Sequence, residues 1–416
     1  MKGINARVVG QISLSKAEPE WMEQLRLRSL SLFGEQPMAE WFAVNMPDID
    51  FQDIDEALQP GDARRDLAGN TALPGSEAVG PERRADLEEQ GVLFCDMDTA
   101  VREYPRMVQE YFGTIIPPGD DKFADLNTSA WSGGSFVYVP PGVEVAMPLQ
   151  SDIRPNSETG GQFQRTLIIA DEGSKVRYIE GCSAPVYTQD ALRCAVVEIV
   201  VKPNAWVSYT TMQNWSHNVD NLVTNRARVE ADGHMEFVDV NIGSKLTVKY
   251  PAIYLVGDGA SGEVRSVAYA GKGQHQDTGA KMVHAAPNTT SKIVSKSMSQ
   301  DGGTTTCRGL VSVDEGATGA ASVLSCEALL LDEQSASLNL PHLEILEDDA
   351  QISHETKVSK IANAQLFYLM SHGLSEEQSM GMIVNGFIEP VTKTLPMEYA
   401  VEWSRLIELQ MEGSVG

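Results

Sequence analysis

The chain has 416 residues, 42% of them hydrophobic, which is enough to bury a large core in one long architecture or in two or three modules. Its net charge of −26 argues against a nucleic-acid binder, because phosphate contacts require clustered Lys and Arg. The N-terminus lacks the apolar segment of a secretory signal, and no run of about 18 apolar residues occurs. We therefore expect a cytoplasmic protein that does not cross a membrane.

The first 125 residues are predicted to form an N-terminal helical region. Pro19 suits a first helical turn, and apolar residues from Trp21 to Phe33 recur at helical spacing. A second helical stretch covers 98–112, where Pro105 would bend or split the helix. Residues 60–91 are rich in Gly, Pro and charge, which is typical of a flexible linker, with a short helix near its end as an option.

Residues 126–360 are predicted to form a β-rich core, because short β-branched runs alternate there with Gly, Asn and Asp turns. The turns recur at Asp171, Pro203, Asp232, Gly257, Pro287, Asp314, Asp332 and Glu347. Their spacing is near thirty residues early on and falls to between 15 and 18 at the end. Such repeats, with no amphipathic helix between them, favour a parallel β-helix. A two-sheet sandwich is the alternative.

Residues 361–416 are predicted to be helical again. One helix covers 363–371 and ends before Gly373, and Ser375 begins a capping box for the next helix, which Glu389-Pro390 should end. The last helix, 397–411, carries a broad apolar stripe. At the end of a solenoid such a stripe must cap the stack or dock a partner.

Five cysteines are scattered along the chain without any CxxC pair. They are Cys95, Cys182, Cys194, Cys307 and Cys326. The odd count and the spacing argue against a disulfide framework and against a standard zinc site. The default expectation for each is a small buried hydrophobic side chain.

Several long segments match a known family in order and spacing. The strongest are GSFVYVPPGV (134–143), TGGQFQRTLIIADEGSKVRYIEGCSAP (159–185), VVEIVVKPNAWVSYTTMQNW (196–215), GQHQDTGAKMVH (273–284) and QLFYLMSHGLSEEQSMGMIVNGFIEPV (365–391). From about Trp21 to the C-terminus, the chain resembles the SufB subunit of the SUF iron–sulfur cluster assembly system. The resemblance implies a mainly β fold, a right-handed parallel β-helix flanked by helical N- and C-terminal domains, which agrees with the pattern above.

The resemblance also implies a function and its partners. The chain would be a non-enzymatic scaffold that accepts sulfur and holds a labile iron–sulfur cluster before transfer to apo-proteins or carriers. It would pair with a second copy of itself or with a SufD-like subunit, and its C-terminal helices would dock a SufC-type ABC ATPase. ATP hydrolysis must come from that partner, because the chain has no GxxxxGK[ST] loop. The sulfur donor, a cysteine desulfurase or sulfide, and any reduced flavin in the complex remain open.

Cys182, in the IEGCSAP segment, matches the family position that accepts persulfide sulfur. The resemblance implies that sulfur then passes along the β-helix interior, past polar residues matched by Arg154, Asn156, Gln213 and Trp215. A lysine of that route is replaced by Asn225 in this chain.

Cys326 matches the family cluster ligand, and His354 with Glu355 matches the other ligand candidates, from the same chain or across a dimer interface. Ser353 stands where the family often has an acidic residue, so that position cannot supply a carboxylate. Incomplete thiolate ligation suits a site that must release its cluster.

The remaining cysteines and the histidines at 275 and 284 are predicted to be structural, whereas His217 and His234 should face solvent in turns. Two further hypotheses stay open. One is a SufD-like structural partner without its own cluster. The other is a β-helix carbohydrate enzyme, for which neither a signal peptide nor a clear acid/base pair is present.

Overall fold

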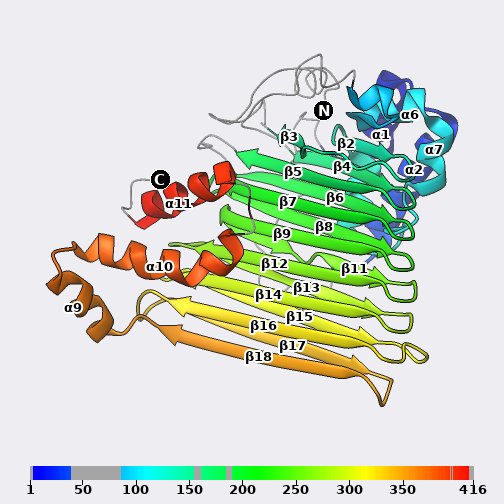
Figure 1. Cartoon of the computed structure of the whole chain (residues 1–416). Coiled ribbons are helices and arrows are strands. Elements are labelled where there is room, and N and C mark those ends of the chain that lie inside the picture. Colours follow the sequence, from blue (N-terminus) through cyan, green and yellow to red (C-terminus); the bar gives the residue numbers. More distant parts are fainter. Residues whose placement is uncertain are drawn as a thin grey trace.

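The β-rich core forms a parallel β-helix, in which successive coils stack as two facing sheets (Figure 1). The computed structural model describes residues 3–38, 86–153, 161–183, 190–393, 395 and 397–411. Among the described strands, every pairing between coils is parallel, and β1 alone joins its neighbour β2 in an antiparallel pair. The predicted mainly β fold, with helices at both ends, is confirmed, and the parallel pairing excludes the sandwich alternative.

The two sheets take alternate strands of the chain. The first sheet contains β1 (Leu93–Asp96), β2 (Ser135–Val139), β4 (Gly161–Ala170), β6 (Ala191–Val201), β8 (Val219–Val229), β10 (Leu246–Lys249), β11 (Ala252–Leu255), β13 (His275–His284), β15 (Thr304–Val313) and β17 (Ala336–Ile345). The second sheet contains β3 (Leu149–Ile153), β5 (Lys175–Ser183), β7 (Trp206–Trp215), β9 (His234–Gly243), β12 (Ser261–Ala270), β14 (Thr290–Ser299), β16 (Ala321–Leu330) and β18 (Gln351–Lys360).

The coil period stays near thirty residues to the end of the stack. Register partners on neighbouring coils are 26 to 32 residues apart. The predicted shortening arose because the turn at Asp332 follows β16, whereas the other turns follow strands of the first sheet. Asn204, Asp232 and Asn288 lie in such turns with φ of 59°, 54° and 56°, a left-handed conformation that Asn and Asp tolerate well.

The core lies between the two sheets. On the inner face of the second sheet one row of side chains is apolar from coil to coil: Tyr178, Tyr209, Phe237, Val264, Ile293 and Leu324. These side chains are buried, and the rings of the two tyrosines stack with centroids 5.4 Å apart. Stacking of like side chains between coils therefore stabilises the solenoid along its axis.

Helices cover the start of the β-helix. They are α1 (Ala6–Lys16), α2 (Glu20–Glu35), α6 (Met97–Glu103), α7 (Pro105–Tyr111) and α8 (Lys122–Ala130). The prediction that Pro105 splits its helix is confirmed, because it occupies the first position of α7, where its missing N–H costs nothing. The predicted linker at 60–91 lies outside the described residues up to residue 85.

A fully buried ion pair within the first sheet supports the contact with these helices. Arg165 donates to Glu198 at 2.5 Å, and both side chains have no exposed surface. Glu198 also accepts the backbone N–H groups of Gly113, Ile115 and Ile116 at 2.9–3.0 Å. The carboxylate therefore has donors on two sides, and the loop after α7 is held against the β-helix by charge-assisted hydrogen bonds.

The C-terminal helices are α9 (Asn363–Ser371), α10 (Glu376–Thr392) and α11 (Met397–Met411). The capping box of Ser375 and Gln378 is present, and Gly373 follows α9 with φ of 94°. The prediction that Pro390 ends α10 is wrong. It removes only one N–H donor in the last turn, and Lys393 still donates to the Glu389 carbonyl at 3.0 Å.

The apolar faces of α10 and α11 cover the second sheet along its outer side. Trp403 and Val384 pack with Val240 and Val267, and all four side chains are fully buried. In contrast, Phe367 of α9 is 72% exposed. No described helix is long and apolar enough to cross a bilayer.

The last coil, formed by β17 and β18, ends the stack without a cover among the described elements (Figure 1). Its strands expose large apolar side chains at Leu338, Leu340, Leu343, Ile345 and Val358. Both strands are therefore open sheet edges with apolar side chains, the combination that marks an interaction surface.

Candidate functional site

Cys182 lies near the end of β5 with its side chain buried inside the β-helix. Its Sγ donates to the Glu180 carboxylate at 3.5 Å, and the guanidinium of Arg193 lies 3.7 Å from the sulfur. Arg193 also contacts Glu180 at 3.4 Å, and Tyr209 donates to the same carboxylate at 2.9 Å. A buried thiol is thus held between a carboxylate and a cation.

Burial raises the pKa of the Cys182 thiol well above its ordinary value. The positive charge of Arg193 lowers this pKa in part, and the carboxylate of Glu180 raises it further. The resting thiol is therefore protonated at neutral pH, with Glu180 as the nearest proton acceptor.

Gln213 and Trp215, two residues of the expected sulfur route, lie beside Cys182. Gln213 is the register partner of Cys182 on β7 and accepts a hydrogen bond from Asn221 at 2.7 Å. Trp215 packs against Cys182, and the guanidinium of Arg193 lies 4.9 Å from its ring centroid. The other two residues of the expected route, Arg154 and Asn156, lie outside the described residues.

A row of polar side chains runs along the inner face of the second sheet, next to the apolar row. It consists of Ser151, Glu180, Thr211, Asp239, Ser266, Ser295, Cys326 and Thr356, each the register partner of the next. All except Thr356 are at most 9% exposed. Buried polar groups cost free energy unless they are paired, so packing alone does not explain a polar residue in every coil.

From Glu180, beside Cys182, this polar row reaches Cys326 after five strand spacings, a distance of about 24 Å. Thr211 donates to Asp239 at 2.6 Å, and Ser266 donates to Ser295 at 2.9 Å. None of these four residues was predicted from the sequence. The only available signal was one polar residue per repeat, and it requires the strand register to be seen.

Asn225 is buried, and neither atom of its side-chain amide has a hydrogen-bond partner among the described residues. A different residue supplies a cation to the interior. Lys249 on β10 is 1% exposed and donates to Thr211 at 2.6 Å and to Asp239 at 2.7 Å. A buried positive charge therefore contacts the polar row from the first sheet, although Asn225 is uncharged.

Cys326 lies on β16 in the inner core and is joined to Cys307 of β15 by a disulfide. The expectation that the cysteines form no disulfide is wrong for this pair. They are 19 residues apart in the chain but face each other from opposite sheets of one coil, with Cα atoms 6.6 Å apart. The spacing alone did not reveal the pair because it matches no known disulfide motif.

The structure separates His354 from Glu355. Thr356 is the register partner of Cys326, and His354 lies two residues earlier, so its side chain is on the same face of the sheet as Cys326. Glu355 is paired with Ser325 and points to the opposite face. Among the described residues, no three His, Cys, Asp or Glu side chains converge as a metal site. One chain alone does not bring all three expected ligands together.

Comparison with known proteins identifies the family. Residues 153–387 match the SufBD core domain of the family described as SUF system FeS cluster assembly, and residues 78–151 match the SufBD protein N-terminal region. The chain belongs to the SufBD family. Iron–sulfur cluster assembly SufBD family proteins of Staphylococcus haemolyticus, Staphylococcus epidermidis and Staphylococcus aureus are each 49% identical over 440 residues, covering 100% of this chain and 94% of each relative.

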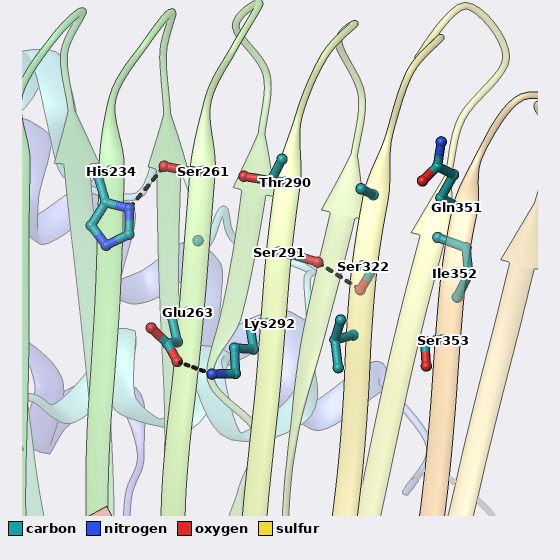
Figure 2. Close-up of a pocket in the computed structure, with 13 residues that line it drawn as sticks. His234, Ser261, Glu263, Thr290, Ser291, Lys292, Ser322, Gln351, Ile352 and Ser353 are labelled. Carbon is teal, nitrogen blue, oxygen red and sulfur yellow. Dashed lines mark hydrogen bonds and ion pairs between the residues drawn. The ribbon is translucent and has the colours of Figure 1, made fainter.

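A groove of about 630 Å³ crosses the second sheet of this SufBD chain where strands β9 to β18 begin (Figure 2). His234 accepts or donates a hydrogen bond with Ser261 at 2.8 Å, and Glu263 pairs with Lys292 at 3.5 Å. Among the described residues around it, no cysteine lines the groove. The prediction that His234 faces solvent in a turn is wrong, because it begins β9 and stacks on Trp206.

His284, at the end of β13, is fully buried within a chain of hydroxyl groups. Its ring nitrogens lie 2.8 Å from the Thr289 and Ser291 hydroxyls, and Ser291 donates to Ser322 at 2.8 Å. Burial lowers the pKa of His284 from 6.5 to about 4. These contacts favour a structural role for this histidine in the SufBD fold.

The lowered pKa of His284 predicts a pH-dependent stability. The unfolded chain binds a proton near pH 6.5 and the folded chain only near pH 4, so acid favours unfolding between these values. We expect His284→Gln, which stays neutral, to lose about 2 kcal/mol less stability than the wild type between pH 7 and pH 5. Urea unfolding at both pH values measures this, and equal losses in the two proteins would contradict it.

Proposed function

We propose that this SufBD protein is a SufB-type scaffold, which accepts sulfur at Cys182 and assembles an iron–sulfur cluster as cargo at Cys326. The observation that supports this most is the buried polar row, which connects the surroundings of the two cysteines through the core. Hydroxyl and carboxylate groups in that row, together with the Lys249 ammonium that contacts them, can solvate a small sulfur species, which an apolar core would exclude.

At Cys182 the neighbouring charges divide the work of sulfur acceptance. Glu180 takes the thiol proton when the sulfur attacks a donor persulfide, and Arg193 stabilises the thiolate that forms. The side chains of Gln213 and Trp215 line the space beside the accepted sulfur.

At Cys326 the cluster is bound by few ligands. Cys326 supplies a thiolate and His354, on the same face of the next coil, an imidazole. Glu355 faces away from Cys326 in its own chain, so it serves as a ligand from the edge of the terminal coil, toward a second subunit. Such a sparse set holds iron and releases the cluster to apo-proteins or carriers.

Two surfaces support the partners of this proposal. The terminal coil, with its open edges and exposed leucines, suits a second copy of the chain or a SufD-like subunit. The exposed residues of the C-terminal helices, Phe367 and Tyr368 on α9 and Met397 on α11, suit a SufC-type ABC ATPase. A persulfide of a cysteine desulfurase supplies sulfane sulfur to Cys182, whereas free sulfide, already at the oxidation level of cluster sulfur, enters directly at Cys326.

The test of this proposal is the Cys326→Ala variant. Wild-type protein, reduced and then incubated without oxygen with Fe(II) and inorganic sulfide, is expected to develop visible charge-transfer absorbance with bound iron and sulfide. Cys326→Ala should lose at least about nine-tenths of it, because the proposed thiolate ligand is gone. Cys194→Ala is the matched control, since Cys194 is equally buried but bonds to the Phe123 carbonyl. Equal cluster content in Cys326→Ala and wild type would overturn the site.

One observation favours a SufD-like partner instead. Cys326 is bound to Cys307 and therefore cannot ligate iron until the disulfide is reduced. The same reconstitution discriminates the two functions, because a SufD-like chain would bind no cluster alone even after reduction.

A further inference from the structure

Cys307 has no role in the proposed assembly site, yet it is the nearest partner of Cys326. Their Cα atoms are 6.6 Å apart, within the range of about 4.4–6.8 Å that a disulfide requires. Close packing of β15 against β16 holds them there, since a Cβ at Gly309 would lie 2.7 Å from the Leu324 side chain. The two sulfurs can therefore react without any movement of a strand.

None of the other described cysteines lies close enough to Cys326 to react with it. Cys194 lies on β6 and donates to the Phe123 carbonyl at 3.3 Å, and Cys95 lies on β1 at the other end of the stack. Cys182 is five strand spacings from Cys326 in the second sheet. Within the described chain, Cys307 alone faces the end of the polar row.

Chemistry supplies a reason for a second thiol at this position. Sulfur that reaches Cys326 as a persulfide is sulfane sulfur, whereas an iron–sulfur cluster contains sulfide. Release of sulfide requires that the terminal sulfur take both electrons of the persulfide S–S bond. A neighbouring thiolate achieves this when it attacks the inner sulfur.

We propose that Cys307 is a resolving thiol that releases sulfide at the assembly site, an inference that rests on the proposed delivery of sulfur to Cys326. The Cys307 thiolate attacks the Cys326 sulfur of Cys326–S–SH and forms the Cys307–Cys326 disulfide. The terminal sulfur leaves as HS⁻, and the proton from Cys307 remains available to it. Two molecules of a low-molecular-weight thiol then reduce the disulfide by exchange and restore both cysteines.

The surroundings of Cys307 support this step. Asn339 of β17 is its register partner in the terminal coil, and both atoms of the Asn339 amide are buried without a hydrogen-bond partner among the described residues. An unpaired amide donor beside a sulfur stabilises a thiolate or a departing hydrosulfide. On the facing strand, His354 lies on the same face as Cys326, so sulfide forms next to a proposed iron ligand.

The experiment measures sulfide release by the full-length chain. Protein is reduced, desalted without oxygen and incubated with inorganic polysulfide, which is then removed by gel filtration before the readouts. The readouts are released sulfide, cyanide-reactive sulfane sulfur and the Cys307–Cys326 disulfide, located by peptide mass spectrometry after alkylation of free thiols. Wild type is expected to form the disulfide and to release one sulfide for each disulfide formed.

Cys307→Ser is expected to form no disulfide, to release at least about tenfold less sulfide and to keep its sulfane sulfur on Cys326. Cys194→Ser is the matched control and should behave as wild type. Sulfide release by Cys307→Ser at the wild-type rate would overturn the proposal. So would wild-type protein that keeps its persulfide and forms no disulfide, a result that does not depend on how the variant folds.

A second arm separates this proposal from the proposed function. With Fe(II) and inorganic sulfide supplied directly, Cys307→Ser should bind as much cluster as wild type, because the release step is bypassed. If neither protein binds a cluster, the scaffold function fails while the sulfide-release result still stands. If only Cys307→Ser fails to bind, Cys307 is a ligand and the resolving role is wrong.

Discussion

Cys182→Ala is expected to reduce sulfur acceptance from a cysteine desulfurase to less than about a tenth of the wild-type level, because the only thiol beside Glu180 and Arg193 is lost. The stability of the variant should fall by only about 1 kcal/mol, since one small buried side chain is removed. Radiolabelled cysteine, a desulfurase and gel filtration measure the protein-bound sulfur, and thermal unfolding measures the stability.

The control separates delivery from assembly. With Fe(II) and inorganic sulfide supplied directly, Cys182→Ala should bind as much cluster as wild type, because Cys326 is intact. Cys194 lies on the facing sheet, and its thiol is as deeply buried as that of Cys182. The Cys194→Ala variant should therefore accept sulfur at the wild-type level. If Cys182→Ala still accepts sulfur from the desulfurase, sulfur enters at another residue. The proposal that it passes from Cys182 along the polar row to Cys326 would then be wrong.

Arg165→Met should be the most destabilising single change in the described ion pairs of the first sheet. It leaves the Glu198 carboxylate buried with three backbone N–H donors but no counter-charge, which typically costs about 3–5 kcal/mol. Because Glu198 holds the loop after α7, the N-terminal helices should loosen before the coils. Hydrogen exchange of residues 105–130 and urea unfolding measure the two effects.

Arg228→Met is the matched control for Arg165→Met. Arg228 lies in the same sheet and pairs with Glu230 at 3.2 Å, but its side chain is 52% exposed. Water screens that pair, so the expected cost is about 0–1 kcal/mol. Equal costs for the two substitutions would show that burial does not strengthen the Arg165–Glu198 interaction.

The solenoid could be predicted from the sequence because its turns carry local signals. Asp232 and Asn288 mark left-handed turn positions, and β-branched runs follow them at a regular spacing. Pro105 was equally informative at the start of a helix, whereas Pro390 was not, because a proline in the last turn removes a single hydrogen bond. Sequence rules for turns and helix ends therefore predict the structure correctly where the wrong residue would cost a large free energy.

The site was only partly predictable, because its decisive contacts join distant residues. Cys182, Gln213 and Trp215 lie together as the family pattern implied. In contrast, the disulfide partner of Cys326 depends on which strands face each other across the coil. The alternation of side chains along β18, which separates His354 from Glu355, depends on strand register. Neither the pairing of facing strands nor the strand register can be derived from the sequence alone.

A repeating coil has no intrinsic length, so a chain of this kind needs a termination signal. Pro341 in β17 provides one, since it offers no N–H to a further strand, and the charged Glu344 follows three residues later on the same edge. A second copy is therefore disfavoured from adding a parallel strand to the open edge of β17 and so extending the stack, while the exposed apolar side chains beside the proline remain able to bind a partner.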